Sequence, residues 1–258
     1  MTKAVILAGG LGTRLSEETV NKPKPMVEIG GQPILWHIMK IYAAHGVKDF
    51  IICAGYMQYL IKEFFANYSL HRSDITFDLK TGAKTIHKTL EADWKVSVID
   101  TGVDTLTGGR IKRVKDYLNK DEPFFLTYGD GVADIDITKL MAHHKKMAKM
   151  VTISAVVPPA RFGQLDIENG IVKNFAEKPK DSEGYINGGF MVIEPKFLDY
   201  IADDKTILER EPMERVVKEG QITAYEHNGF WQPMDKLHDK MLLEGLWASG
   251  KAPWKVWK

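Results

Sequence analysis

A glycine-rich loop with two cationic residues after it is the first feature of this sequence that could do chemistry. Gly9, Gly10 and Gly12 follow an apolar run, and Arg14 and Lys24 come next along the chain. Glycines let the backbone turn sharply and bring its N–H groups close to an anion. A guanidinium can bind two phosphate oxygens at once, and a lysine adds a compact positive charge. Together these groups suit a triphosphate better than a neutral ligand.

Three other interpretations of this loop compete with triphosphate binding. A Walker A loop is excluded because the Gly-Lys-Ser/Thr ending is absent. A dinucleotide-binding loop is disfavoured because Leu15 stands where the third glycine belongs. An ordinary strand-to-helix turn would explain the glycines alone. It does not explain Arg14 or the Pro-Lys-Pro-Met segment at residues 23–26.

Asp130 is a candidate for holding a metal ion. It follows the apolar run of residues 123–128, and Gly129 and Gly131 on either side leave room for a metal and a phosphate. A carboxylate at the carboxyl end of a parallel strand lies where open α/β sheets bind ligands. Mg²⁺ usually takes one or two carboxylates together with phosphate oxygens and water. Taken alone, Asp130 would equally fit a turn aspartate that accepts a local backbone hydrogen bond.

Strands that alternate with helices are expected to position these groups. Four apolar runs are typical of buried strands, namely residues 4–8, 50–54, 95–100 and 123–128. Helical patterns follow at residues 33–45, 57–67 and 108–118. This alternation predicts an α/β fold in which helices cover both faces of a mainly parallel sheet.

The rest of the chain departs from this alternation. Residues 73–94 read as an irregular or β-rich insertion. From residue 151 the pattern shifts toward a mixed sheet, which we expect to carry the partner substrate, and residues 165–172 predict a hairpin with an Asn-Gly turn. Residues 236–249 are amphipathic and precede an aromatic tail at residues 253–257. That tail either docks on its own domain or forms a subunit contact, because Trp is enriched at interfaces.

Composition is that of an ordinary globular protein, with 258 residues, 44% of them apolar and 27% charged. The formal net charge of +1 does not indicate a partner nucleic acid. The single cysteine, Cys53, lies in an apolar run, so a buried structural thiol fits better than a nucleophile. No apolar segment is long enough to span a membrane, and the N-terminus lacks a signal-peptide layout. We therefore expect a cytoplasmic protein without a membrane partner.

Two segments, GGLGTRL and NKPKPM, resemble the signature of the sugar-phosphate nucleotidyltransferases, which make nucleotide sugars. The resemblance extends over nearly the whole chain, including GFWQPMDKLHDK near its end. It is closest to the branch that joins CTP and α-D-glucose 1-phosphate into CDP-glucose and pyrophosphate. The resemblance implies Mg²⁺ as cofactor, a Rossmann-like (GT-A-like) fold with a mixed central sheet and a smaller β-rich sugar-binding region, and a homo-oligomer such as a hexamer. It also implies one domain over residues 1–258, with a nucleotide-binding half at 1–150 and a sugar-binding and C-terminal part at 151–258.

The resemblance also assigns roles to individual residues. The expected nucleotide-binding residues are Leu7, Ala8, Gly9, Gly10, Leu11, Gly12, Thr13, Arg14, Lys24, Thr105, Arg110 and Gly129. The expected sugar-phosphate-binding residues are Tyr128, Arg161, Glu177, Lys178, Asn187 and Gly188. Arg14 and Lys24 are expected to be catalytic, and Asp130 and Asp235 to bind the metal. Two plainer roles compete: Lys24 could be a solvated surface lysine, and Asp235 could cap the following helix.

One alternative to cytidylyl transfer is an enzyme of the same class that uses another nucleotide, and two others are proteins of different classes. Many relatives that use dTTP or UTP carry a proline soon after the Gly-Thr-Arg element, whereas Ser16 follows Leu15 here. This departure agrees with the cytidylyl branch but does not define the base, so uridylyl or thymidylyl transfer stays open. A nucleotide-sugar-sensing module without catalysis is disfavoured, because such modules lose a loop cation or a metal aspartate. A nicotinamide-dependent enzyme is disfavoured by the missing third glycine.

Overall fold

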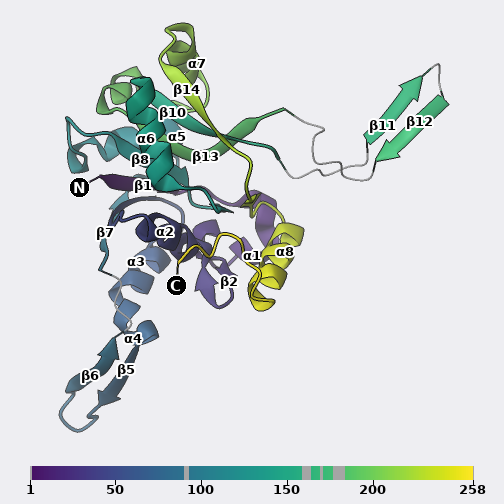
Figure 1. Cartoon of the computed structure of the whole chain (residues 1–258). Helices are drawn as coiled ribbons and strands as arrows, with labels where there is room; N and C mark the ends of the chain where they lie inside the picture. Colours follow the sequence, from purple (N-terminus) through teal and green to yellow (C-terminus); the bar gives the residue numbers. More distant parts are fainter. Residues whose placement is uncertain (1, 90–92, 159–163, 169–170, 177–183, 258) are drawn as a thin grey trace.

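The computed structural model of the chain describes residues 2–89, 93–158, 164–168, 171–176 and 184–257. Its main element is a seven-stranded mixed sheet (Figure 1). In spatial order the strands are β14 (Ile222–His227), β10 (Val151–Val156), β13 (Ile186–Ile193), β8 (Phe124–Tyr128), β1 (Lys3–Ala8), β4 (Asp49–Ala54) and β7 (Lys95–Asp100). Strand β13 runs antiparallel to both of its neighbours, and the other neighbouring pairs are parallel. The carboxyl ends of six strands and the start of β13 therefore lie along the same side of the sheet, where these strands end.

Two hydrophobic clusters cover the two faces of the sheet, because successive side chains of a strand point to opposite sides. In β1, for example, Ala4 and Ile6 belong to one cluster, whereas Val5 and Leu7 belong to the other. The first cluster includes residues of α2 (Ile34–Ala44), α3 (Gln58–Ala66), α6 (Ile137–Met147) and α8 (Leu237–Ala248). The second includes residues of α5 (Thr107–Arg113), η4 (Pro195–Tyr200) and α7 (Glu211–Lys218). The expected α/β fold with helices on both faces is confirmed.

Short helices and small sheets complete the described structure. The short helices are η1 (Thr13–Leu15), α1 (Ser16–Thr19), η2 (Lys24–Met26), α4 (Tyr68–Arg72) and η3 (Lys115–Tyr117). The two-stranded pairs are β2 (Glu28–Ile29) with β3 (Gln32–Pro33), β5 (Ser73–Phe77) with β6 (Lys84–Thr89), β9 (Gly131–Ala133) with β15 (Trp231–Pro233), and β11 (Gln164–Glu168) with β12 (Ile171–Ala176). The β5–β6 pair stands away from the main sheet in Figure 1 and confirms the β-rich insertion. Pairing of β11 with β12 confirms the hairpin, although its Asn-Gly turn lies outside the described residues.

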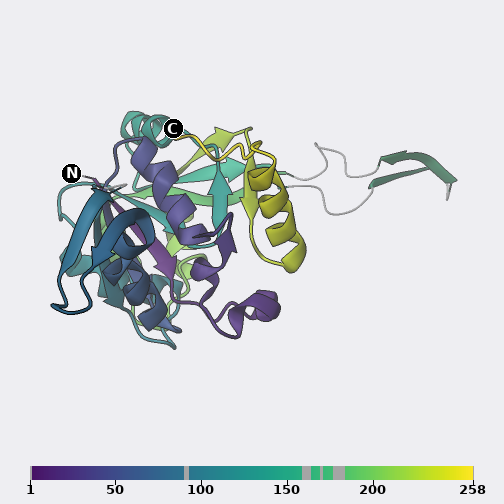
Figure 2. The ribbon, with the colours of Figure 1, turned by 90° about the horizontal axis from the view of Figure 1, so that it is seen from below.

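The end of the chain folds back on the first cluster, beside segments from its beginning (Figure 2). Trp254 is fully buried, and its indole N–H donates to Nδ1 of His37, 3.3 Å away, on α2. Since Nδ1 accepts this bond, the ring proton sits on Nε2, which donates to the carbonyl of Ile29 at 2.8 Å. Burial lowers the pKa of His37 to about 4, so this imidazole is neutral. Of the two alternatives for the aromatic tail, the structure shows docking of Trp254 on its own domain, and a subunit contact stays untested.

In the part of the chain that the structure describes, every helix is too short or too polar to cross a bilayer.

Candidate active site

A cleft of about 420 Å³ lies at the edge where β1 and β8 end. Ten of the twelve residues predicted to bind the nucleotide line it. The lining residues are Leu7, Ala8, Gly9, Gly10, Gly12, Thr13, Lys24, Pro25, Thr105, Leu106, Thr107, Arg110, Tyr128, Gly129 and Asp130. The two others are Leu11, which is 53% exposed, and Arg14, whose side chain lies outside the described part of the structure.

Glycines shape this cleft in three different ways. Gly12 has a φ of +67°, in the left-handed region that favours glycine. A methyl group on Gly9 would collide with the Arg110 guanidinium, and one on Gly129 would stand 2.8 Å from a carbonyl oxygen of β1. A methyl group on Gly10 would meet no atom within 4 Å. Gly9, Gly12 and Gly129 are thus required by the fold, whereas Gly10 keeps part of the cleft open.

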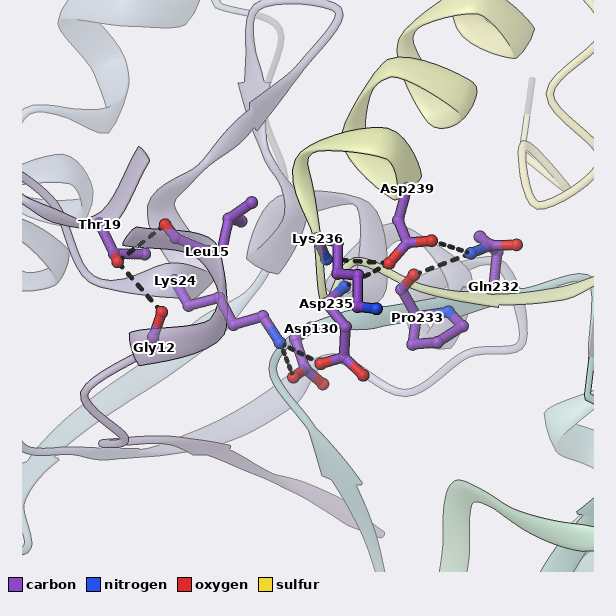
Figure 3. A network of polar contacts seen from close by, with 10 residues as sticks. All are labelled: Gly12, Leu15, Thr19, Lys24, Asp130, Gln232, Pro233, Asp235, Lys236 and Asp239. Atoms are coloured by element: carbon purple, nitrogen blue, oxygen red, sulfur yellow. Dashed lines mark hydrogen bonds and ion pairs between the residues drawn. The ribbon is translucent and has the colours of Figure 1, made fainter. Parts of the chain in front are cut away.

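Lys24 and two aspartates form the charged centre of the site (Figure 3). Helix η2 begins at Lys24, where the preceding Pro23 is extended and the amide of Val27 closes the turn on the Lys24 carbonyl. The Lys24 ammonium donates to Oδ2 of Asp130 at 2.6 Å and to Oδ1 of Asp235 at 2.7 Å. Lys24 is only 7% exposed, so the alternative of a solvated surface lysine is wrong.

Pairing of β9 with β15 explains why two aspartates so far apart in sequence converge. Asp130 immediately precedes β9, and Asp235 follows β15 by two residues. The two strands run antiparallel, with Gly131 opposite Pro233, and the amide of Met234 donates to the carbonyl of Asp130 at 2.8 Å. This short sheet therefore brings both carboxylates to one point beside the cleft.

The helix-capping alternative for Asp235 is not what the structure shows. The N-cap position of α8 is Lys236, one residue later. Asp239 accepts hydrogen bonds from the amides of Asp235 and Lys236, at 3.0 and 2.9 Å, while the Asp235 carboxylate turns to Lys24 (Figure 3). Capping and ion pairing are thus done by different aspartates.

The donor set at this point fits Mg²⁺. Two carboxylates already surround one positive charge, and Mg²⁺ uses one or two carboxylates and takes its other ligands from phosphate and water. Among the described residues no group of three or more His, Cys, Asp or Glu side chains could hold a metal ion. A metal here would consequently depend on substrate phosphates for part of its coordination shell.

Arg110 lines the cleft, yet its guanidinium is engaged within the protein. The side chain is 5% exposed, and burial lowers its pKa. It donates to five acceptors within 3.4 Å: the carbonyl oxygens of Ala54, Gly9, Gly102 and Val103, and the Thr101 hydroxyl. Arg110 therefore ties the end of β4 to the loops that follow β1 and β7. Its predicted contact with the nucleotide stays a prediction.

Three residues predicted to bind the sugar phosphate lie at the same edge of the sheet. Tyr128 ends β8, and its ring packs on Gly189, where a methyl group would stand 2.6 Å from the ring. Asn187 accepts from the amide of Gly189 at 2.9 Å, and the carbonyl of Gly188 accepts from Trp231 at 2.7 Å.

The other three predicted sugar-phosphate residues, Arg161, Glu177 and Lys178, lie outside the described residues. Sequence reasoning missed Glu209, which accepts a hydrogen bond from the Tyr128 phenol at 2.5 Å. Its neighbours in the chain form no motif, so no signal in the sequence could have found it.

Comparison with known proteins decides the family. The model of the nucleotidyl transferase family matches residues 3–232. The chain belongs to this family. It is 57% identical, over 256 residues, to the glucose-1-phosphate cytidylyltransferase of Salmonella typhi, and the match covers 99% of this chain and all of that protein. A probable glucose-1-phosphate cytidylyltransferase of Bacillus subtilis is 44% identical over the same shares of both chains.

Two solved structures are similar to this chain over nearly its whole length. HddC from Yersinia pseudotuberculosis superposes with a TM-score of 0.70 at 25% identity, covering 96% of this chain and all of that one. A UDP-glucose pyrophosphorylase in complex with UDP-glucose has a TM-score of 0.69 and covers 97% of this chain and 99% of its own. At 15% identity the latter shows the shared fold alone. The family and fold expected from the sequence are confirmed.

Proposed function

We propose that this protein transfers a cytidylyl group from CTP to α-D-glucose 1-phosphate and releases pyrophosphate. The observation that carries the proposal is the 57% identity, along the whole chain, to a glucose-1-phosphate cytidylyltransferase. The cleft and its charged centre agree with it, because Lys24, Asp130 and Asp235 converge beside the glycine-rich loop.

The reaction is a displacement at the α-phosphorus of CTP. An oxygen of the sugar phosphate forms the new bond to phosphorus, the bond to the β-phosphate bridging oxygen breaks, and pyrophosphate leaves with that electron pair. The protein needs no covalent nucleophile, so alignment of two anions and stabilisation of their charge carry the catalysis. Mg²⁺ held by Asp130 and Asp235 would neutralise phosphate charge.

The remaining roles fall to the chain's own cations and hydrogen-bond donors. Backbone N–H groups of the loop at residues 9–13 would cradle the triphosphate, and Arg14 would bind its outer phosphates. Lys24 would stabilise the charge that develops around the α-phosphorus, since its buried ammonium is held in place by two carboxylates.

The sugar phosphate would contact Tyr128, Asn187 and Gly188. Further contacts would come from Arg161, Glu177 and Lys178. In this proposal residues 1–150 bind the nucleotide and residues 151–258 bind the sugar. We also propose that the enzyme works in the cytoplasm, as a homo-oligomer.

Pyrophosphate release tests the proposal in the purified protein and in an Asp130→Asn variant. With Mg²⁺, CTP and glucose 1-phosphate, the wild type should release pyrophosphate and form CDP-glucose, identified by its mass. The variant should lose at least about 100-fold in kcat, the scale of losing one preorganised charge-stabilising group. Its melting temperature should match that of the wild type. Wild-type turnover in the variant would refute the role given to Asp130, and silence of the wild type would refute the reaction.

A further inference from the structure

Glu209 joins two walls of the cleft that come from distant parts of the chain. One oxygen of its carboxylate accepts from the Tyr128 phenol at 2.5 Å, and the other accepts from the Thr107 hydroxyl at 2.8 Å. Tyr128 and Thr107 both line the cleft, whereas Glu209 is exposed and does not line it. The carboxylate therefore bridges the end of β8 and the start of α5.

The backbone around Glu209 is held against α5 by several independent contacts. The amide of Leu208 donates to the Thr107 hydroxyl at 2.9 Å, and the amides of Leu106 and Gly108 donate to the carbonyls of Asp204 and Thr206, at 2.8 and 3.0 Å. Methyl groups on Gly108 and Gly109 would collide with this segment, at 2.8 and 2.5 Å. These contacts hold the backbone of residues 204–209 in place against α5, and they thereby fix the position from which the Glu209 side chain extends.

Besides Glu209, the Tyr128 phenol meets the side chain of Asn187, and its ring packs against the second hydrophobic cluster. One side of its ring rests on Gly189, which has no side chain to hold it. Burial first, and then the charge and hydrogen bond of Glu209, raise the pKa of Tyr128, so the phenol is a donor at neutral pH. Because Glu209 accepts that proton at a short distance, it fixes the direction in which the phenol points.

We propose that Glu209 is a positioning residue that orients Tyr128, and through it the sugar-phosphate side of the cleft. The inference rests on the proposed function, because it assigns Tyr128 to the sugar phosphate. Glu209 touches neither substrate in this role. Its effect should consequently fall on binding of the sugar phosphate and leave the CTP side largely unchanged.

Two substitutions at Glu209 separate this role from others. Glu209→Ala removes both acceptors and should raise the KM for glucose 1-phosphate about tenfold, as expected for losing a hydrogen bond to a charged group. The kcat and the KM for CTP should change less than about twofold, since Glu209 contacts no reacting group. Glu209→Gln keeps a side chain that can bond both hydroxyls, so it should recover most of the affinity. The same KM increase in the Gln and Ala variants would overturn the proposal.

A matched control exists elsewhere in the chain. Glu219 accepts a hydrogen bond from the Tyr200 phenol, and both side chains are outside the cleft. Glu219→Ala should leave every kinetic constant unchanged. In a Tyr128→Phe background, Glu209→Ala should add little, because the group that Glu209 orients is already gone. Additive effects of the two substitutions would contradict action through Tyr128.

A spectroscopic readout keeps the inference testable without turnover. In protein labelled with 3-fluorotyrosine, the ¹⁹F resonance missing from Tyr128→Phe identifies Tyr128. This resonance should shift in Glu209→Ala and stay in place in Glu219→Ala. An unmoved resonance would overturn the positioning role even in an active enzyme. If the resonance moves while the wild type turns over no nucleotide, the proposed function fails but Glu209 still orients Tyr128.

Discussion

Replacing Arg110 by lysine tests whether this residue holds the cleft together. The guanidinium donates to five acceptors on two loops and at the end of β4, namely the carbonyls of Ala54, Gly9, Gly102 and Val103 and the Thr101 hydroxyl. A lysine keeps the charge but offers three N–H donors from a single nitrogen, without the planar fork. At least two of the five acceptors therefore lose their partner.

The expected loss of stability follows from this count. A hydrogen bond from a charged group contributes about 1.5–3 kcal/mol, so losing two costs about 3–6 kcal/mol of unfolding free energy. For a chain of this size that corresponds to a fall in melting temperature on the order of 10 °C. Because the Gly9 carbonyl is one of the acceptors, the loop should loosen and the KM for CTP should rise in the same variant.

Urea unfolding and calorimetry of Arg110→Lys measure this loss directly. Arg113→Lys is the matched control: Arg113 lies on the same helix and pairs with Asp204, but both side chains are exposed. Exposed ion pairs contribute little to stability, so the control should unfold like the wild type. If Arg110→Lys also stayed within about 1 kcal/mol of the wild type, less than one such hydrogen bond, the structural role of its guanidinium would be refuted.

Three further predictions concern other parts of the molecule. Gly9→Ala should lower the melting temperature, because its methyl group would collide with the Arg110 guanidinium. Gly10→Ala should melt like the wild type and raise the KM for CTP, because its methyl group would meet no protein atom and would enter the cleft. Equal melting temperatures of the two variants would contradict the close contact between Gly9 and Arg110. Lys24→Met should lose at least about 100-fold in kcat, and Mg²⁺ should stabilise it more than the wild type in thermal scans, because its two carboxylates lack their cation; an equal Mg²⁺ effect would contradict this pairing. His37 has a folded-state pKa of about 4, below the ordinary 6.5, so its contribution is complete above pH 6.5 and is lost as the pH falls toward 4. Between pH 7.5 and 5 this costs about 2 kcal/mol, and His37→Gln should remove that part of the slope in urea titrations; an unchanged slope would argue against a buried neutral imidazole.

Much of the fold could be predicted from the sequence, because the central parallel strands are continuous apolar runs. Strands β1, β4, β7 and β8 fall where these runs predict them, and α2, α3 and α8 end within two residues of their expected bounds. Helix α5 is shorter than predicted: it ends at Arg113 and a separate turn, η3, follows. The antiparallel direction of β13 could not be predicted, since it depends on which distant strands pair.

The candidate site was predictable only in part, for the same reason. The residues of the glycine-rich loop are close together in sequence, so their types alone predict the loop. The burial of Lys24 between Asp130 and Asp235 depends on pairing of β9 with β15, which no local pattern reveals. A sequence likewise cannot show that a guanidinium faces carbonyl oxygens, as in Arg110, or that an exposed carboxylate, that of Glu209, bridges two walls of the cleft.

The measurement that most directly tests cytidylyl transfer is pyrophosphate release with glucose 1-phosphate, Mg²⁺ and one of CTP, UTP, dTTP, ATP or GTP at a time. Cytosine and uracil differ at one exocyclic position, an amine donor against a carbonyl acceptor, so a site built for one should reject the other clearly. The account predicts the highest kcat/KM with CTP. A higher kcat/KM with UTP or dTTP would keep the chemistry of the site and contradict the assigned substrate, and no release with any nucleotide would contradict the reaction itself.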